Sequence, residues 1–338
     1  MPEGDTIHRA AIALRTALVG KPTVTFRAPR LLGPMPTPGR TIESIESHGK
    51  HLEIIWDDGL TLHTNLRMSG TWHLYRVGER WRKRDDQMRV SIEVDEWIAV
   101  CFNAPLVETY RQFDRHRHPG FGRLGPDLCR PNADLDESVD RLLDYQDPLA
   151  FIAEVLLDQH VASGVGNVYR SEVLWAVQLS PFATVGSLSR EDAAQVVNTA
   201  ARMLRASLND GRRASVPGVA PGLTVYGRNG QRCERCGDTI QVKRFGEMNR
   251  LLYWCPDCQS RGDARVNPTP PQGMERPMDP HPAAAMYLSD LPWRRHVDTP
   301  YPSQLGAQPD DRTDDRTDDR TDDRTHPVER RRGHADTG

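Results

Sequence analysis

Alternating apolar and polar residues dominate the segment from residue 41 to residue 102. Residues 52–63 read Leu-Glu-Ile-Ile-Trp-Asp-Asp-Gly-Leu-Thr-Leu-His. Because an Asp-Gly pair between alternating runs is typical of a tight turn, this stretch predicts a β-hairpin. Residues 90–101 repeat the pattern around a short Asp-Glu connection. We therefore predict an antiparallel β-sandwich over residues 1–125, with one early helix over residues 5–18.

Helical spacing replaces this pattern after residue 131. Asp147 followed by a proline is typical of a helix start and predicts a helix over residues 147–160. A glycine-rich segment, 162–167, breaks the spacing, which resumes over residues 168–177. A serine followed three positions later by an acidic residue resembles a capping box and opens a helix over residues 189–208. We expect a second domain of four helices.

Four of the six cysteines form two close pairs, Cys233-x2-Cys236 and Cys255-x2-Cys258, with eighteen residues between them. Two such pairs on turns can present four thiolates to one zinc ion. A site without metal is the alternative. Four thiolates leave no open position on zinc, so we predict a structural ion. We expect Cys101 and Cys129 to be ordinary core thiols.

The composition changes after Arg261, first to a proline-rich stretch and then to four copies of Asp-Asp-Arg-Thr between residues 310 and 325. Such a segment buries too little apolar surface to offset the entropy of ordering. One apolar run at residues 286–293 is either a docking motif or incidental. The predicted α+β organisation comprises a sandwich, a helical domain, a zinc finger and a disordered tail, over residues 1–125, 126–222, 223–261 and 262–338.

The charge of the whole chain, −3, does not identify a partner. The tail from residue 262 contains 11 basic and 15 acidic residues, so 33 and 32 remain in residues 1–261, a balance of +1. Basic residues cluster locally at 76–89 and 111–123, where solvated loops and phosphate contacts are both plausible. No apolar run approaches a membrane span, and the N-terminus lacks the features of a signal peptide, so we expect a cytosolic protein.

Five short motifs follow one another along the chain. They are Pro-Glu-Gly-Asp-Thr-Ile at residues 2–7, Ser-His-Gly-Lys-His-Leu at 47–52, the segment 157–172 with its Gly-Val-Gly-Asn turn, Val-Tyr-Gly-Arg at 225–228, and an arginine five residues before Cys255. Together and in this order they resemble the Fpg/Nei family of DNA glycosylases, most closely its endonuclease VIII (Nei) branch. From chemistry alone, the turn at 164–167 would offer backbone N–H groups to a phosphate.

The resemblance implies a bifunctional enzyme of base excision repair. Removal of Met1 would leave Pro2 with a secondary amine, whose pKa near ~8 leaves about a tenth of it neutral at pH 7. That amine would attack C1′ of the deoxyribose and start β,δ-elimination. Glu3 would pass protons, and Lys50 and Arg250 would assist.

The resemblance also assigns DNA contacts. Asn167 and Arg250 are similar to a pair that grips phosphates flanking the lesion, and Arg123 matches a DNA-contact position. Arg67 and Met68 occupy the place of the wedge that fills the gap left by a flipped base, a buried methionine being the alternative.

Two departures from the Fpg branch favour oxidised pyrimidines over 8-oxoguanine. A second void-filling loop is not recognisable around residues 112–114, and the loop between residues 210 and 222 is short. We further expect a monomer that binds damaged double-stranded DNA, with single-stranded or bubble DNA also open, and a partner protein for the tail. A catalytically idle, lesion-binding paralogue and a zinc-ribbon transcription accessory are rival interpretations.

Overall fold

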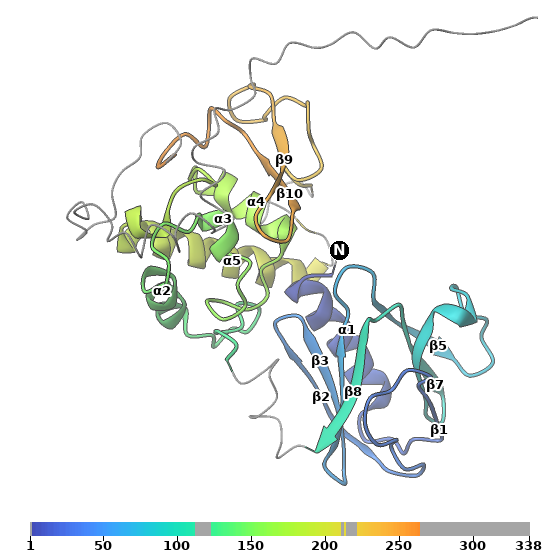
Figure 1. Ribbon diagram of the computed structural model, residues 1–338. Coiled ribbons are helices and arrows are strands. Elements are labelled where there is room, and N and C mark those ends of the chain that lie inside the picture. The colour runs from blue at the N-terminus through green and yellow to red at the C-terminus, as the bar shows by residue number, and fades with distance from the viewer. Residues whose placement is uncertain (1, 112–122, 211–212, 214–221, 264–338) are drawn as a thin grey trace, which may run out of the picture. The chain divides into compact units, whose positions relative to one another are not determined.

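The computed structural model describes residues 2–111, 123–210, 213 and 222–263. The first part contains helix α1 (Gly4–Leu18) and two four-stranded antiparallel sheets, with strand orders β1-β6-β7-β5 and β2-β3-β4-β8 (Figure 1). The strands are β1 (Thr25–Arg27), β2 (Ile42–His48), β3 (His51–Trp56), β4 (Leu60–Asn65), β5 (Thr71–Arg76), β6 (Met88–Glu93), β7 (Trp97–Phe102) and β8 (Leu106–Arg111), with a 3-10 turn, η1 (Asp85–Gln87). Both predicted hairpins, β3–β4 and β6–β7, are confirmed.

Strand β3 is buried along its whole length. Leu52, Ile54 and Trp56 are fully buried in the same apolar cluster as Ile7 and Leu14, which lie on one face of α1. The intervening positions of β3 are buried as well. Strand β3 therefore holds the centre of the sheet, and its first residue fixes the position of the turn that contains Lys50.

The helical part contains α2 (Leu135–Leu143), α3 (Ile152–Val155), α4 (Asn167–Ala176), the 3-10 turn η3 (Val185–Ser187) and α5 (Arg190–Asp210). The described residues of the helical part thus contain four α-helices, the number expected for the second domain. The predicted capping box is confirmed, since the Ser189 hydroxyl accepts from the Asp192 backbone N–H at 3.1 Å.

The prediction of one helix over residues 147–160 is wrong, because only the four residues of α3 are helical. The Asp147 carboxylate does accept a backbone N–H group, that of Leu149 at 2.9 Å, but the residues that follow form a turn and not a helix. Phe151 then pairs with Thr184 in an antiparallel bridge, which requires extended backbone. After α3, Asp158 accepts from His160 N at 2.9 Å and turns the chain again. Tertiary pairing and local side-chain caps override the helical spacing here.

The last part is a hairpin of β9 (Gln241–Phe245) and β10 (Arg250–Trp254). Its start is anchored by the Glu172 carboxylate of α4, which accepts from Thr224 N at 2.9 Å and Tyr226 N at 2.7 Å. Trp254 packs edge-on against Phe182, with ring centroids 5.3 Å apart, in the core of the helical part. The finger hairpin is thus packed onto the helices.

The predicted tail falls almost entirely outside the described residues, which end at Asp263. Arg261 still pairs with the helical part, because its carbonyl accepts from Ser180 N at 2.9 Å, and Asp263 is buried. Among the helices in the described ranges, none has the length and apolar character to cross a membrane.

Candidate active site

The Glu3 side chain is fully buried at the N-terminus of α4. Its carboxylate accepts from the backbone N–H groups of Gly166 at 3.1 Å, Val168 at 2.8 Å and Tyr169 at 3.2 Å. Free N–H groups and the positive end of the helix dipole favour an anion at this position. Residue 3 is therefore locked to an element more than 160 residues further along the chain.

Three backbone N–H groups at the glycine-rich turn and the start of α4, those of Gly166, Val168 and Tyr169, donate to a carboxylate of the chain itself. These three are therefore not available to the DNA phosphate that the sequence analysis expected there. Gly166 must lack a side chain because a Cβ there would lie 2.4 Å from the Glu3 Cδ atom. Gly164 has φ +107° and accepts from Gly4 N at 2.9 Å. The turn therefore serves to hold the N-terminal segment.

Lys50 lies in the turn between β2 and β3 and shares its surroundings with Glu3, Arg250 and Arg170. The pKa of Lys50 is lowered to about 8, mainly by burial; Glu3 opposes this shift, and Arg250 and Arg170 contribute to it. Three of the four predicted catalytic residues therefore interact electrostatically. An anionic group placed among these cations would relieve their mutual repulsion, which is the property expected of a phosphate site.

The turn that holds Lys50 is fixed by Asp127, a residue that the sequence interpretation did not single out. Its carboxylate accepts from Gly49 N at 2.9 Å and from Cys129 N at 3.0 Å, and it contacts His8 Nε2 of α1 at 2.8 Å. Burial would raise the pKa of Asp127, but His8 and these N–H groups outweigh it and hold that pKa below its usual range. One carboxylate thus ties the lysine turn to α1.

Asn167 and Arg250 lie on neighbouring elements. The buried Asn167 side chain donates to the Leu251 carbonyl of β10 at 2.7 Å and accepts from Arg170, which also donates to that carbonyl at 3.2 Å. Arg250 begins β10 and is partly exposed. The two residues expected to hold phosphates are therefore joined through the finger hairpin and the start of α4.

The remaining predicted DNA contacts are accessible. Met68 is 62% exposed, so the alternative of a buried methionine is wrong. Arg67 has φ +42°, and its backbone N–H donates to the Asn65 side chain at 3.1 Å, which shapes a tight turn. Arg123 is exposed and Pro2 partly exposed.

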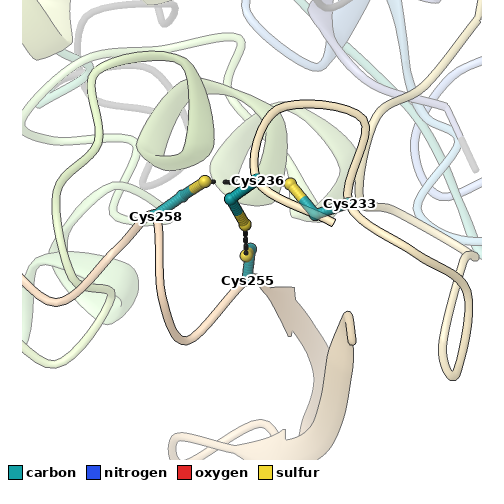
Figure 2. A group of neighbouring side chains, drawn as sticks. All are labelled: Cys233, Cys236, Cys255 and Cys258. Atoms are coloured by element: carbon teal, nitrogen blue, oxygen red, sulfur yellow. Dashed lines mark hydrogen bonds between the residues drawn. The ribbon is translucent and has the colours of Figure 1, made fainter. Parts of the chain in front are cut away.

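The four cysteine sulfurs lie within 4.8 Å of one another, two from the loop before β9 and two after β10 (Figure 2). Cys233 and Cys258 are 3.8 Å apart, and Cys236 and Cys255 are 3.4 Å apart. Tetrahedral zinc with bonds of about 2.3 Å would place sulfurs about 3.8 Å from each other. The indole N–H of Trp175 reaches Cys233 Sγ at 3.4 Å, as an outer-shell donor would. The donor set therefore fits zinc. Cys101 and Cys129 are buried core thiols, as predicted.

A second buried group, around Asp5, also escaped the sequence interpretation. Arg213 donates to both Asp5 oxygens, at 2.7 and 2.8 Å, and Tyr169 and Ser207 donate to the same carboxylate. Burial would raise the pKa of Asp5, but Arg213 lowers it below the usual range. The position of Asp5, two residues after Glu3 in the N-terminal motif, was the available signal.

Comparisons with known proteins agree with this architecture. A profile described as the formamidopyrimidine-DNA glycosylase N-terminal domain matches residues 1–106, and one described as the H2TH domain of that glycosylase matches residues 124–216. A solved complex of Lactococcus lactis Fpg with abasic-site DNA is similar with a TM-score of 0.65 and 22% identity, covering 77% of this chain and all of that one. A complex of MutM with DNA containing carbocyclic 8-oxo-G gives a TM-score of 0.66 with the same identity and coverage.

Two curated relatives are more similar in sequence. A probable endonuclease 8 2 from Streptomyces coelicolor is 36% identical over 77% of this chain and 94% of its own length. The DNA-(apurinic or apyrimidinic site) lyase Nei2 of Mycolicibacterium smegmatis is 36% identical over 77% and 99%. The chain therefore belongs to the Fpg/Nei family of DNA glycosylases and abasic-site lyases. Within that family it is similar to the endonuclease VIII (Nei) branch.

Proposed function

We propose that this protein excises oxidised bases, chiefly pyrimidines, from DNA and nicks the strand at the resulting abasic site. The observation that carries the proposal is the buried Glu3 carboxylate. It is fixed by three backbone N–H groups, directly follows Pro2 and interacts with Lys50. A surface carboxylate would need no such anchoring. Fixed geometry at the nucleophile is what an amine-based lyase requires.

The chemistry starts at the Pro2 amine once Met1 has been removed. The nitrogen attacks C1′, the glycosidic bond breaks, and the base leaves with a proton. Transfer of a proton to the ring oxygen breaks its bond to C1′ and leaves an iminium, which acidifies C2′. Loss of a C2′ proton then drives elimination of the 3′ phosphate, and elimination of the 5′ phosphate follows. A carboxylate has about four lone-pair sites, and three of those of Glu3 accept backbone N–H groups. The remaining lone-pair site can take up a proton and pass it to the ring oxygen as the sugar opens.

Lys50, Asn167 and Arg250 would hold the phosphates around the lesion. Arg250 lowers the pKa of Lys50, and a phosphate bound by both residues would offset that repulsion. The Asn167 side chain donates a hydrogen bond to the carbonyl of Leu251, the residue after Arg250, so Asn167 and Arg250 would both be positioned by the finger hairpin. Arg250 would also assist δ-elimination, and Arg123 would contact the DNA backbone further along the duplex.

Met68 and Arg67 would enter the duplex where the base has left. An exposed apolar side chain on a tight turn suits that role, because unstacked bases leave an apolar gap. Zinc would bind Cys233, Cys236, Cys255 and Cys258, and it would hold the hairpin without taking part in the reaction. We further propose a monomer that works in the bacterial cytosol, with a partner for the tail.

Borohydride reduction of the protein mixed with abasic-site DNA tests this function. The expected result is a covalent protein–DNA adduct with the native chain and none with Pro2→Ala, while both bind the duplex. Binding without any adduct in the native chain would instead support the catalytically idle paralogue. Absence of DNA binding by the native chain would contradict the proposed function.

A further inference from the structure

A hollow of about 420 Å³ opens on the sandwich beside the proposed wedge. Two arginines, a serine and an asparagine contribute its polar lining, and none of the residues that line it is acidic. The lining residues are Arg30, Ser69, Arg89, Asn103, Ala104, Pro105 and Val107. A concave surface with two guanidinium groups and no carboxylate favours an anion.

Sheet register places this hollow on the far side of the wedge from Lys50. His51 of β3 pairs with Asn65 of β4, and Asn65 pairs with Leu106 of β8. Because β3, β4 and β8 are neighbours in that order, their connections at this edge follow the same order. The Lys50 turn comes first, the loop with Met68 and Ser69 second, and the segment just before Leu106 third.

The walls of the hollow are held by internal hydrogen bonds. The Ser69 hydroxyl donates to the Asn103 carbonyl at 3.4 Å, so the wedge loop and the far wall are joined. Asn103 N in turn donates to the Gln87 carbonyl at 2.8 Å. The Arg89 guanidinium donates to the carbonyls of Asp86 at 3.0 Å and Met88 at 3.1 Å, which orients it. An oriented guanidinium loses less entropy on binding than a free one.

We propose that Arg30 and Arg89 bind a backbone phosphate of the complementary strand, the strand opposite the lesion. This inference rests on the proposed function, which assigns the lesion-strand phosphates to Lys50 and the gap in the duplex to Met68. A wedge that enters between the two strands has the lesion strand on one side and its complement on the other. The hollow lies on the second side, and its chemistry suits a phosphate.

The test is a double-mutant cycle between a protein charge and a DNA charge. Duplexes with a tetrahydrofuran abasic analogue carry one neutral methylphosphonate, moved stepwise along either strand near the lesion. For the native protein, a methylphosphonate at one or two positions of the complementary strand should weaken binding roughly tenfold at each position. In Arg30→Ala, and in Arg89→Ala as the second variant, a methylphosphonate at the same positions should weaken binding little further. The salt dependence of binding should also fall by about one unit of slope.

Arg40→Ala supplies a matched loss of charge. Arg40 lies 3.7 Å from Asp57, which follows the opposite end of β3, so its loss should leave the methylphosphonate profile unchanged. Coupling of Arg30 and Arg89 to lesion-strand phosphates, or to no phosphate, would overturn the proposal. So would a loss that depends on the identity of the base opposite the lesion. Borohydride trapping should persist in Arg40→Ala, and its absence in the native chain would mean that the proposed function itself had failed.

Discussion

At the scale of single residues, the site combines groups that the sequence reveals with groups that it does not. The spacing of the cysteines points to them directly, whereas Pro2 and Glu3 are indicated by the resemblance of the N-terminal motif to the Fpg/Nei family. Asp127 and His8 are 119 residues apart, and no local pattern links them. Arg170 has the spacing of an ordinary helix residue, and its burial beside Asn167 emerges only from the fold.

Lys50 predicts a specific pH dependence of DNA binding. Its pKa is lowered to about 8 in the free protein, mainly by burial, and a bound phosphate would raise it. Affinity for a tetrahydrofuran-containing duplex should therefore be level below pH 8 and fall by up to about tenfold per pH unit above it. Lys50→Arg stays charged, so its affinity should remain level over this range. An equal decline in both proteins would assign the titration to another group.

Gly166 predicts the cost of disturbing Glu3. A Cβ at residue 166 would lie 2.4 Å from the Glu3 Cδ and 2.7 Å from its Oε1 atom, so Gly166→Ala must displace the carboxylate. Trapping rates should fall roughly a hundredfold, while thermal melting shows a folded protein. Gly222→Ala is the matched control, because a Cβ there meets no heavy atom of the described residues within 4 Å. Similar trapping by both variants would remove the carboxylate anchor from the mechanism.

At the scale of elements, strands were easier to predict than helices. The segments with alternating apolar and polar residues are the strands β3, β4, β6 and β7, although burial does not follow the alternation in β3 and β4, where nearly every residue is buried. The segment 147–160 has helical spacing, but backbone pairing between Phe151 and Thr184 limits the helix to α3. The helical spacing of apolar residues indicates which residues are buried. It gives no information on backbone pairing with a segment that is distant in the sequence.

The finger hairpin yields a prediction for Arg250, which begins β10 and interacts with Lys50. Arg250→Ala should weaken DNA binding, lower the salt slope by about one unit and suppress δ-elimination more than formation of the covalent adduct. Zinc content, measured by elemental analysis, should be unchanged because no cysteine is altered. Loss of the metal together with normal DNA binding at every salt concentration would make Arg250 a folding residue.

At the scale of the whole molecule, the described residues contain every proposed catalytic and metal-binding residue. The sequence places the end of the finger at residue 261, whereas the structure carries ordered contacts two residues further, to the buried Asp263. The boundary at residue 261 was predicted from a change in composition. Such a change cannot show that one acidic side chain beyond it, that of Asp263, is buried.

Deletion of residues 264–338 should therefore leave lyase activity on a short abasic duplex within a few fold of the full chain. The repeated Asp-Asp-Arg-Thr segment cannot supply fixed catalytic geometry. Gel-based nicking assays on both proteins, under equal salt, give the comparison. A hundredfold loss would show that the tail belongs to the active unit.

The central claim is that the nitrogen of residue 2 forms the covalent intermediate, held in place by Glu3. Peptide mapping of the borohydride-reduced adduct by mass spectrometry tests it most directly. The account predicts that the reduced sugar is attached to the N-terminal peptide, at Pro2, and that Met1 is absent from that peptide. Attachment to Lys50 or to any other lysine would contradict it.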